Sequence, residues 1–381
     1  ERGDHHSYYS KIIFMMLSLG SRTALSSPKS FKSPRSRAPP PIRVRATSAT
    51  QNGTVDWEIC RQSGLTRLQY RREGWNFWQW RNSQDTSSGA SDSSGKRVHW
   101  CAAGEIGAPP VLLIHGYGAS AYHWRYNIPE LAKHHRVYAL CLLGFGWSEK
   151  AQVDYNNGKQ WIPQIADFIE QVIWPEIGTK QRVVLVGNSL GGYASLAAGS
   201  LRPDLVRAVA LLNGAGPFED PTKPPADPNR QQTLTEQLQV VVTGLIKRVV
   251  LLLAFVRAKQ PARIREVLEL VYTNKGQLDD DLVDSIVQPA TDPAAADVFY
   301  RINHRTTPPL TINALLARLQ APLLLLWGLQ DPWITPAKAE QVRALYPTAQ
   351  LVGLQAGHCP HDDDPVGANA ALLNWLKDLK D

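Results

Sequence analysis

The chain has 381 residues, of which 43% are hydrophobic and 20% charged, a composition typical of a globular enzyme and not of a membrane bundle. The net charge of +7 would suit a nucleic-acid-binding protein, but residues 1–46 contain nine Lys/Arg and two Asp/Glu and carry the whole surplus. The rest of the chain is neutral, so charge gives no reason to expect nucleic acid as a partner.

The first 46 residues have the composition of an organelle transit peptide. From a candidate initiator at Met15 or Met16 to the end of this segment there is no acidic residue, while Ser, Pro, Arg and Lys are frequent. Ile42–Ala46 resembles a chloroplast processing site, and the alternative is a basic tail that is retained. The apolar run Ile12–Leu19 is too short to span a bilayer.

After this segment, short apolar strands alternate with helices. Two strands at Asn76–Trp80 and Arg97–Trp100 are predicted to form a hairpin around a polar loop at Asn82–Gly95. Further strands are predicted at Val111–Ile114, Val137–Leu140, Val183–Val186 and Ala208–Leu212, and helices at Tyr126–His135, Trp161–Val172 and Leu190–Leu201. This alternation predicts an α/β fold with a mostly parallel, doubly wound sheet.

The alternation stops at about residue 216, where a helical stretch begins with the Pro-rich segment Pro221–Pro228. It resumes with strands at Leu323–Trp327 and Gln350–Leu354 and helices at Pro336–Leu345 and Pro365–Leu379. The sequence therefore predicts a core in two parts, residues 57–215 and 321–381, with a helical cap inserted at residues 216–320.

One cap segment, Leu238–Ala258, is strongly apolar. Lys247 and Arg248 interrupt it centrally, which makes a membrane-spanning helix costly. We expect a lid helix over the active site, and its apolar face could also contact a lipid surface or a long hydrocarbon.

The segment Gly187-Asn188-Ser189-Leu190-Gly191 follows a predicted strand and precedes a predicted helix. In this context the pattern G-x-S-x-G predicts a sharp strand-to-helix turn, because the glycines leave room for close backbone contact. The turn would hold Ser189 above the sheet edge as a nucleophile.

A serine nucleophile needs a base and an acid, which in this arrangement follow it in the order acid, base. His358, just after the last strand, is the candidate base, and Asp331, after the preceding strand, is the candidate acid. The other acid position holds Asn213, which cannot serve. His361 lies among aspartates and is predicted to be solvated.

The loop after strand Val111–Ile114 is the expected place for an oxyanion hole. We expect the backbone N–H groups of Tyr117 and Leu190 to converge on the developing oxyanion. His115, Gly116 and Asn188 are expected beside the substrate, although His115 is better suited to bracing the loop.

No metal or cofactor is expected. The four cysteines are scattered and form no CxxC pair, which argues against a zinc site or a disulfide framework. They are Cys60, Cys101, Cys141 and Cys359.

Several longer motifs resemble the chlorophyll dephytylases, which are plastid α/β-hydrolases that release phytol from chlorophyll. The resemblance extends from about Trp57 to Leu379. The motifs are Ser63–Trp80, Ala119–Ala132, Leu142–Glu149, Gly187–Tyr193, Tyr272-Thr273-Asn274, Val298–Arg301 and Gln355–Asp362. The chain departs from the family pattern at Cys141, where that pattern suggests an aspartate bracing the oxyanion loop.

The resemblance implies an α/β-hydrolase fold with Ser189, Asp331 and His358 as its triad. It implies hydrolysis of the phytyl ester of chlorophyll to chlorophyllide and phytol without a cofactor. The protein would then reside in the chloroplast, in the stroma or on the thylakoid, with peripheral membrane contact through the cap. The alternatives are a plastid esterase or lipase acting on pheophytin or another hydrophobic ester, or a non-catalytic ligand receptor or pigment-handling accessory on the same fold.

Removal of residues 1–46 is expected to leave ester hydrolysis intact and to abolish import into isolated chloroplasts, because the basic segment would carry the import signal. Import and protease protection of the radiolabelled full chain would be compared with those of the truncated chain. Uptake of the truncated chain would rule out the transit-peptide interpretation.

Overall fold

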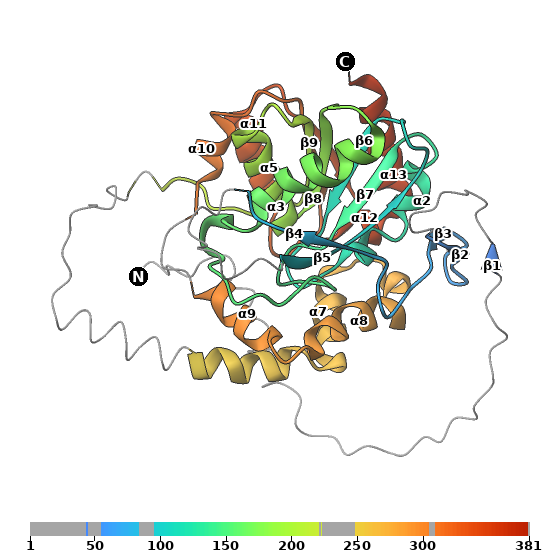
Figure 1. The fold of residues 1–381 in the computed structure, drawn as a ribbon, viewed down its shortest axis with the longest axis vertical. Coiled ribbons are helices and arrows are strands. Elements are labelled where there is room, and N and C mark those ends of the chain that lie inside the picture. The colour runs from blue at the N-terminus through green and yellow to red at the C-terminus, as the bar shows by residue number, and fades with distance from the viewer. Residues whose placement is uncertain are drawn as a thin grey trace.

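The computed structural model describes residues 43–44, 55–83, 95–220, 222, 248–304 and 309–379. Its centre is an eight-stranded sheet with the strand order β11-β10-β9-β8-β6-β7-β5-β4 (Figure 1). The strands are β4 (Asn76–Trp80), β5 (Lys96–Ala103), β6 (Pro110–Ile114), β7 (Arg136–Leu140), β8 (Val183–Asn188), β9 (Val206–Leu212), β10 (Leu323–Gly328) and β11 (Gln350–Leu354).

The sheet is mostly parallel. All neighbouring strands from β11 to β7 run parallel, whereas β5 pairs antiparallel with both β7 and β4. The predicted hairpin and the doubly wound sheet are therefore confirmed. A small second sheet contains β1 (Arg43–Val44), β2 (Trp57–Ile59) and β3 (Thr66–Leu68) in antiparallel order, so β1 lies within the predicted transit segment.

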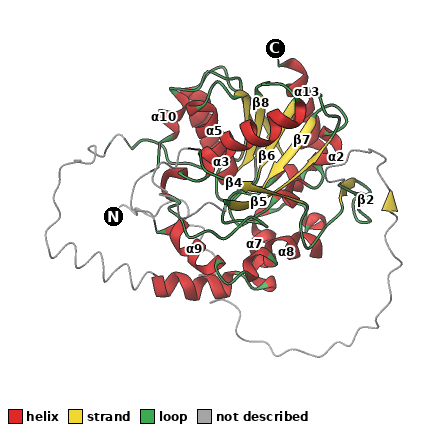
Figure 2. Cartoon of the chain, viewed as in Figure 1, coloured by secondary structure: helices red, strands yellow, loops and turns green. Residues whose placement is uncertain are grey.

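Helices cover both faces of the large sheet (Figure 2). On one face lie α3 (Trp161–Phe168), α5 (Leu190–Leu201), α10 (Ile312–Leu316) and α11 (Pro336–Leu345), and on the other α2 (Asn127–Leu131) and α13 (Pro365–Asp378). Each face of the sheet has its own hydrophobic core, and alternate residues of a strand point into different cores. In β6, Leu112 and Ile114 pack into the core on the α5 face, and Val111 and Leu113 pack into the core on the α13 face. Burial on both faces explains why these strands are apolar throughout.

Two predicted helices differ in extent from those observed. The helix expected at Tyr126–His135 ends at Leu131, because the next four residues form a turn that leads into β7. The helix expected at Trp161–Val172 is α3 followed by a π-helical turn at Ile169–Ile173 and the short α4 (Trp174–Ile177).

Between β9 and β10 the described residues are mainly helical. They include a helix at 248–258, α7 (Pro261–Val271), α8 (Asp280–Val287) and α9 (Ala295–Asn303), together with α10. In Figure 1 the first four lie together below the sheet. None of the helices in the described ranges is long and apolar enough to cross a membrane.

Parts of three predicted segments lie outside the described residues: the transit segment apart from β1, residues 84–94 of the hairpin loop, and residues 238–247 of the apolar cap segment. The Pro-rich start of the cap is likewise outside them, apart from residue 222. The cap boundaries at 216 and 320 therefore stay predictions.

A buried arginine joins the cap to the core. The side chain of Arg125 is fully buried, and its guanidinium group donates to Asp362 of the core at 2.8 Å. It also donates to two groups of the cap, the Asp279 carboxylate and the Gln277 carbonyl, each at 2.7 Å. The buried guanidinium group therefore has hydrogen-bond partners in both the core and the cap. These bonds hold the segment between α7 and α8 on the core.

Candidate active site

The turn between β8 and α5 places Ser189 in a strained backbone conformation. Its φ of 52° and ψ of −115° lie in a region that residues with side chains rarely adopt. Two flanking glycines make this possible: a Cβ on Gly187 would lie 2.3 Å from the Gly191 carbonyl oxygen, and one on Gly191 would lie 2.2 Å from that of Ile114. The first turn of α5 therefore packs directly on the end of β6, as a nucleophile turn requires.

The structure brings the candidate acid and base together. The Asp331 carboxylate lies 2.7 Å from Nδ1 of His358, and both side chains are buried. A carboxylate at this distance can only accept, so Nδ1 carries the proton and Nε2 is left as the acceptor. His358 and Ser189 line the same pocket. This tautomer is the one that a base for Ser189 needs.

Asn213 holds the acid in place, a role that the sequence interpretation missed. Its Nδ2 donates to Asp331 Oδ2 at 2.8 Å, and its Oδ1 accepts from the Gly328 N–H at 2.8 Å. The backbone N–H of Trp333 donates to the other Asp331 oxygen at 2.7 Å. An amide cannot act as the acid, but that of Asn213 is suited to orienting a carboxylate in the loop after the neighbouring strand β10.

His115 braces the loop after β6. Its Nδ1 donates to the Gly116 carbonyl at 2.7 Å, and its Nε2 accepts from the Leu142 N–H at 3.0 Å. Burial lowers the pKa of His115 to about 3, so the ring stays neutral. The ring is fully buried and does not line the pocket, which corrects the expectation that His115 lies beside the substrate.

The other residues expected around the nucleophile lie next to it. A Cβ on Gly116 would meet the Ser189 Cβ at 3.3 Å, so this loop passes directly beside the nucleophile. Gly116, Tyr117 and Asn188 line the pocket. Leu190 is the first residue of α5, where helix N–H groups have no acceptor within the helix. The Asn188 side chain donates to the carbonyls of Leu212 and His358. It therefore ties the turn at Ser189 to the loop after β11 that carries His358, which we call the base loop.

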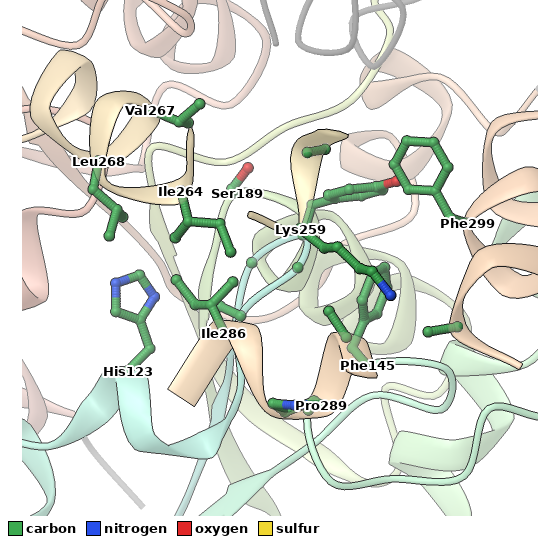
Figure 3. A pocket seen from close by; sticks show the side chains of 18 of the residues that line it. His123, Phe145, Ser189, Lys259, Ile264, Val267, Leu268, Ile286, Pro289 and Phe299 are labelled. Atoms are coloured by element: carbon green, nitrogen blue, oxygen red, sulfur yellow. The ribbon is translucent and has the colours of Figure 1, made fainter. Parts of the chain in front are cut away.

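The pocket between core and cap encloses about 190 Å³ (Figure 3). Its walls are largely apolar, and the cap and the core each supply about half of the lining residues. Apolar lining residues include Phe145, Phe255, Ile264, Leu268, Val298 and Phe299. Such a lining favours a hydrophobic ligand, with the polar groups of Ser189 and His358 in one wall.

His361 is buried, contrary to the prediction that it is solvated. Its ring packs on Trp124 with centroids 4.1 Å apart and is fully inaccessible. The neighbouring aspartates point to buried partners, Asp362 to Arg125 and Asp363 to backbone N–H groups. Burial lowers the pKa of His361 well below its usual value, so its ring stays neutral.

Cys141 lies at a convergence of hydrogen-bond donors. His99 Nε2 accepts from the Trp75 N–H, so its Nδ1 donates to Cys141 Sγ, at 3.1 Å. The Ala121 N–H donates to the same sulfur at 3.3 Å. Burial raises the pKa of Cys141 to about 11, so these donors surround a neutral thiol. The next residue, Leu142, bonds to His115, which connects the position to the oxyanion loop.

All four cysteines are buried and free. Among the described residues there is no group of three or more His, Cys, Asp or Glu side chains that could hold a metal ion.

Comparison with known proteins identifies similar sequences. A model of the alpha/beta hydrolase fold family matches residues 109–365. The chloroplastic pheophytinase of Arabidopsis thaliana is 28% identical over 323 residues, which is 74% of this chain and 65% of that protein. A 2-hydroxy-6-oxo-6-(2'-aminophenyl)hexa-2,4-dienoic acid hydrolase of Metapseudomonas resinovorans is 37% identical over 33% of this chain and 41% of its own length. The chain thus matches less than two thirds of the length of either relative.

Solved structures share the fold. A bacterial membrane phospholipase A superposes with a TM-score of 0.58 and 25% identity, covering 81% of this chain and 87% of that one. An esterase of Thermogutta terrifontis superposes with a TM-score of 0.56 and 21% identity, covering 76% and 96% of the two chains.

Replacing Cys141 with aspartate is expected to raise kcat/KM for a short ester roughly fivefold, the equivalent of about 1 kcal/mol. A carboxylate would accept charge-assisted hydrogen bonds from His99 and Ala121 and hold the oxyanion loop more firmly. Cys141→Asn has the same shape without the charge and serves as the matched control. Equal or lower activity of Cys141→Asp would mean that the thiol is already well accommodated.

Proposed function

The chain belongs to the alpha/beta hydrolase fold family, and from this premise we propose that it is a serine ester hydrolase that cleaves the phytyl ester of chlorophyll to chlorophyllide and phytol. The observation that carries the proposal is the pairing of Asp331 with His358 beside Ser189 in one apolar pocket. The match to a chloroplastic pheophytinase supports a pigment ester as the substrate class.

In the first step Ser189 Oγ attacks the ester carbonyl carbon while Nε2 of His358 takes its proton. The Tyr117 and Leu190 N–H groups stabilise the negative charge on the carbonyl oxygen, a contribution of about 3 kcal/mol per donor. The tetrahedral intermediate then expels the phytol oxygen, which receives the proton from His358. Asp331, held by Asn213, keeps the imidazolium oriented throughout.

In the second step water attacks the acyl-enzyme. His358 takes a proton from the water and returns it to Ser189 Oγ, and the free carboxylic acid leaves. A single base therefore serves both halves of the reaction, and no cofactor is required.

Pheophytin is the alternative substrate. It is favoured by the 28% identity between this chain and the Arabidopsis pheophytinase. The two pigments carry the same phytyl ester and differ in the central magnesium. The apolar lining suits the hydrocarbon portion of either, so the distinction between them requires a direct comparison.

We also propose that the protein works in the plastid and contacts an anionic lipid surface through the helix at 248–258. One face of this helix exposes large aliphatic side chains: Val249, Val250, Leu253 and Val256 are 58, 51, 67 and 54% exposed. Arg248, which also pairs with Asp297, precedes this face and the exposed Arg257 follows it, a pattern that suits anionic headgroups. Phe255 on the same helix lines the pocket that contains Ser189. A lipid-soluble ester could therefore move from the membrane surface along this helix into the pocket.

Incubation of the full chain with chlorophyll a, pheophytin a and a short p-nitrophenyl ester tests the reaction and the substrate together. Ser189→Ala is expected to reduce release of the acid from the preferred ester by at least roughly 10⁴-fold, the scale for loss of a triad member. Products would be quantified by chromatography.

The outcomes separate the alternatives. Release of chlorophyllide that depends on Ser189 supports the proposal, and exclusive turnover of pheophytin favours the alternative pigment. Turnover of the short ester alone keeps the esterase and rejects the pigment. An inactive chain whose Ser189→Ala variant keeps its biological function would point to a ligand receptor.

Leu253→Asp is expected to weaken binding to anionic vesicles roughly 10-fold or more, because it replaces an aliphatic contact by a charge of the same sign as the lipid. Leu345→Asp, which alters a 43% exposed leucine on α11 away from the cap, is the control. Binding would be measured by co-sedimentation with vesicles containing phosphatidylglycerol. Equal binding by wild type and Leu253→Asp would reject this face as the contact.

A further inference from the structure

The Asp363 carboxylate is buried and accepts four hydrogen bonds. Oδ2 accepts from the Gly357 N–H at 2.6 Å and from the N–H and Oγ1–H of Thr273, each at 2.9 Å. Oδ1 accepts from the Asn274 N–H at 2.7 Å. Four donors can compensate the loss of hydration of one carboxylate, and several of them would lose their partner if it were removed.

These donors belong to two different parts of the molecule. Gly357 directly precedes the base His358, whereas Thr273 and Asn274 follow α7 of the cap. Asp363 itself ends the short helix α12 (Pro360–Asp363), which follows the base. The carboxylate therefore joins the base loop to the corner of the cap at Val271–Asn274.

A second contact joins the same two segments. The His358 N–H donates to the Val271 carbonyl at 2.9 Å. The approach is so close that a Cβ on Gly357 would lie 1.9 Å from that carbonyl oxygen. The backbone of the base thus rests on the end of α7, and the Asp363 bonds hold it there.

Asp331 and Asp363 constrain different parts of the base. Asp331 bonds to the ring of His358 and fixes its tautomer. Asp363 accepts from the backbone N–H of Gly357, the residue before the base. Proton transfer requires the base within hydrogen-bond reach of the nucleophile, and a displacement of about 1 Å can cost roughly 100-fold in rate.

We propose that Asp363 is a positioning residue for the reaction: its carboxylate ties Gly357, the residue before the base, to Thr273 and Asn274, so that the cap sets the position of the base. The inference rests on the proposed function, in which Ser189 is the nucleophile and His358 its base. Asp363 neither lines the pocket nor contacts the triad side chains in the described structure.

The test compares Asp363→Asn and Thr273→Val in the full chain. Asparagine keeps the shape but places an amide against a backbone N–H, and valine keeps the shape of Thr273 but removes one donor. Asp364→Ala is the matched control, because the Asp364 side chain caps α13 through the Gly367 N–H and forms no hydrogen bond to the described residues of the cap. Its loss should cost roughly 1 kcal/mol of stability without moving the base.

Three readouts separate positioning from stability: kcat and KM for a short p-nitrophenyl ester, the rate of fluorophosphonate labelling of Ser189, and the melting temperature. Asp363→Asn should lower kcat and the labelling rate about 10- to 100-fold with little change in KM. Thr273→Val should lower them less, Thr273→Ser should restore them, and the double variant should lose less than the product of the single losses. Asp364→Ala should lower only the melting temperature.

Asp363→Asn with an unchanged labelling rate, or a loss of rate equal to that in Asp364→Ala, would overturn the inference. If Asp363→Asn does not fold, Thr273→Val at wild-type kcat would overturn it instead. Wild-type protein that fails to label at Ser189 would overturn the proposed function and this inference with it. Labelling of wild type with unchanged variants would overturn the inference alone.

Discussion

The packing of the β8–α5 turn on the end of β6 is the constraint on which the site depends. Gly187 and Gly191 allow backbone atoms to approach more closely than any side chain would permit, and Ser189 adopts a positive φ as a result. The loop at Gly116 passes directly beside Ser189. One backbone contact therefore sets the position of Ser189 relative to the loop after β6, and the strain is sustained by the apolar sheet around it.

His358 differs from three other buried histidines in its hydrogen-bond partner. Burial lowers the pKa of His99, His115 and His123 to about 3, so these rings act as neutral hydrogen-bonding groups. His358 alone among the histidines of the described chain is paired with a carboxylate at hydrogen-bond distance. The pocket that Ser189 and His358 line is largely apolar. The site thus combines one oriented base with surroundings suited to a hydrophobic substrate.

The parts of this arrangement that depend on local pattern could be predicted from the sequence. The alternation of strands and helices, the turn at Ser189 and the positions of Asp331 and His358 follow from periodicity, glycines and chain order. The burial of His361 could not be predicted, because the aspartates beside it are matched by Arg125, more than 230 residues away in the chain. The role of Asn213 and the bonds of Asp363 were missed for the same reason: their partners lie on other strands or in the cap.

The buried guanidinium of Arg125 has a consequence for exchanging parts between relatives. Its charge is balanced by Asp362 of the core and Asp279 of the cap together. A chimera that receives a foreign cap without an acid at the position of Asp279 would keep a buried cation with half of its compensation. A cap that replaces this one must therefore keep an acidic residue opposite Arg125, whereas the residues that line the pocket can be changed without affecting this ion pair.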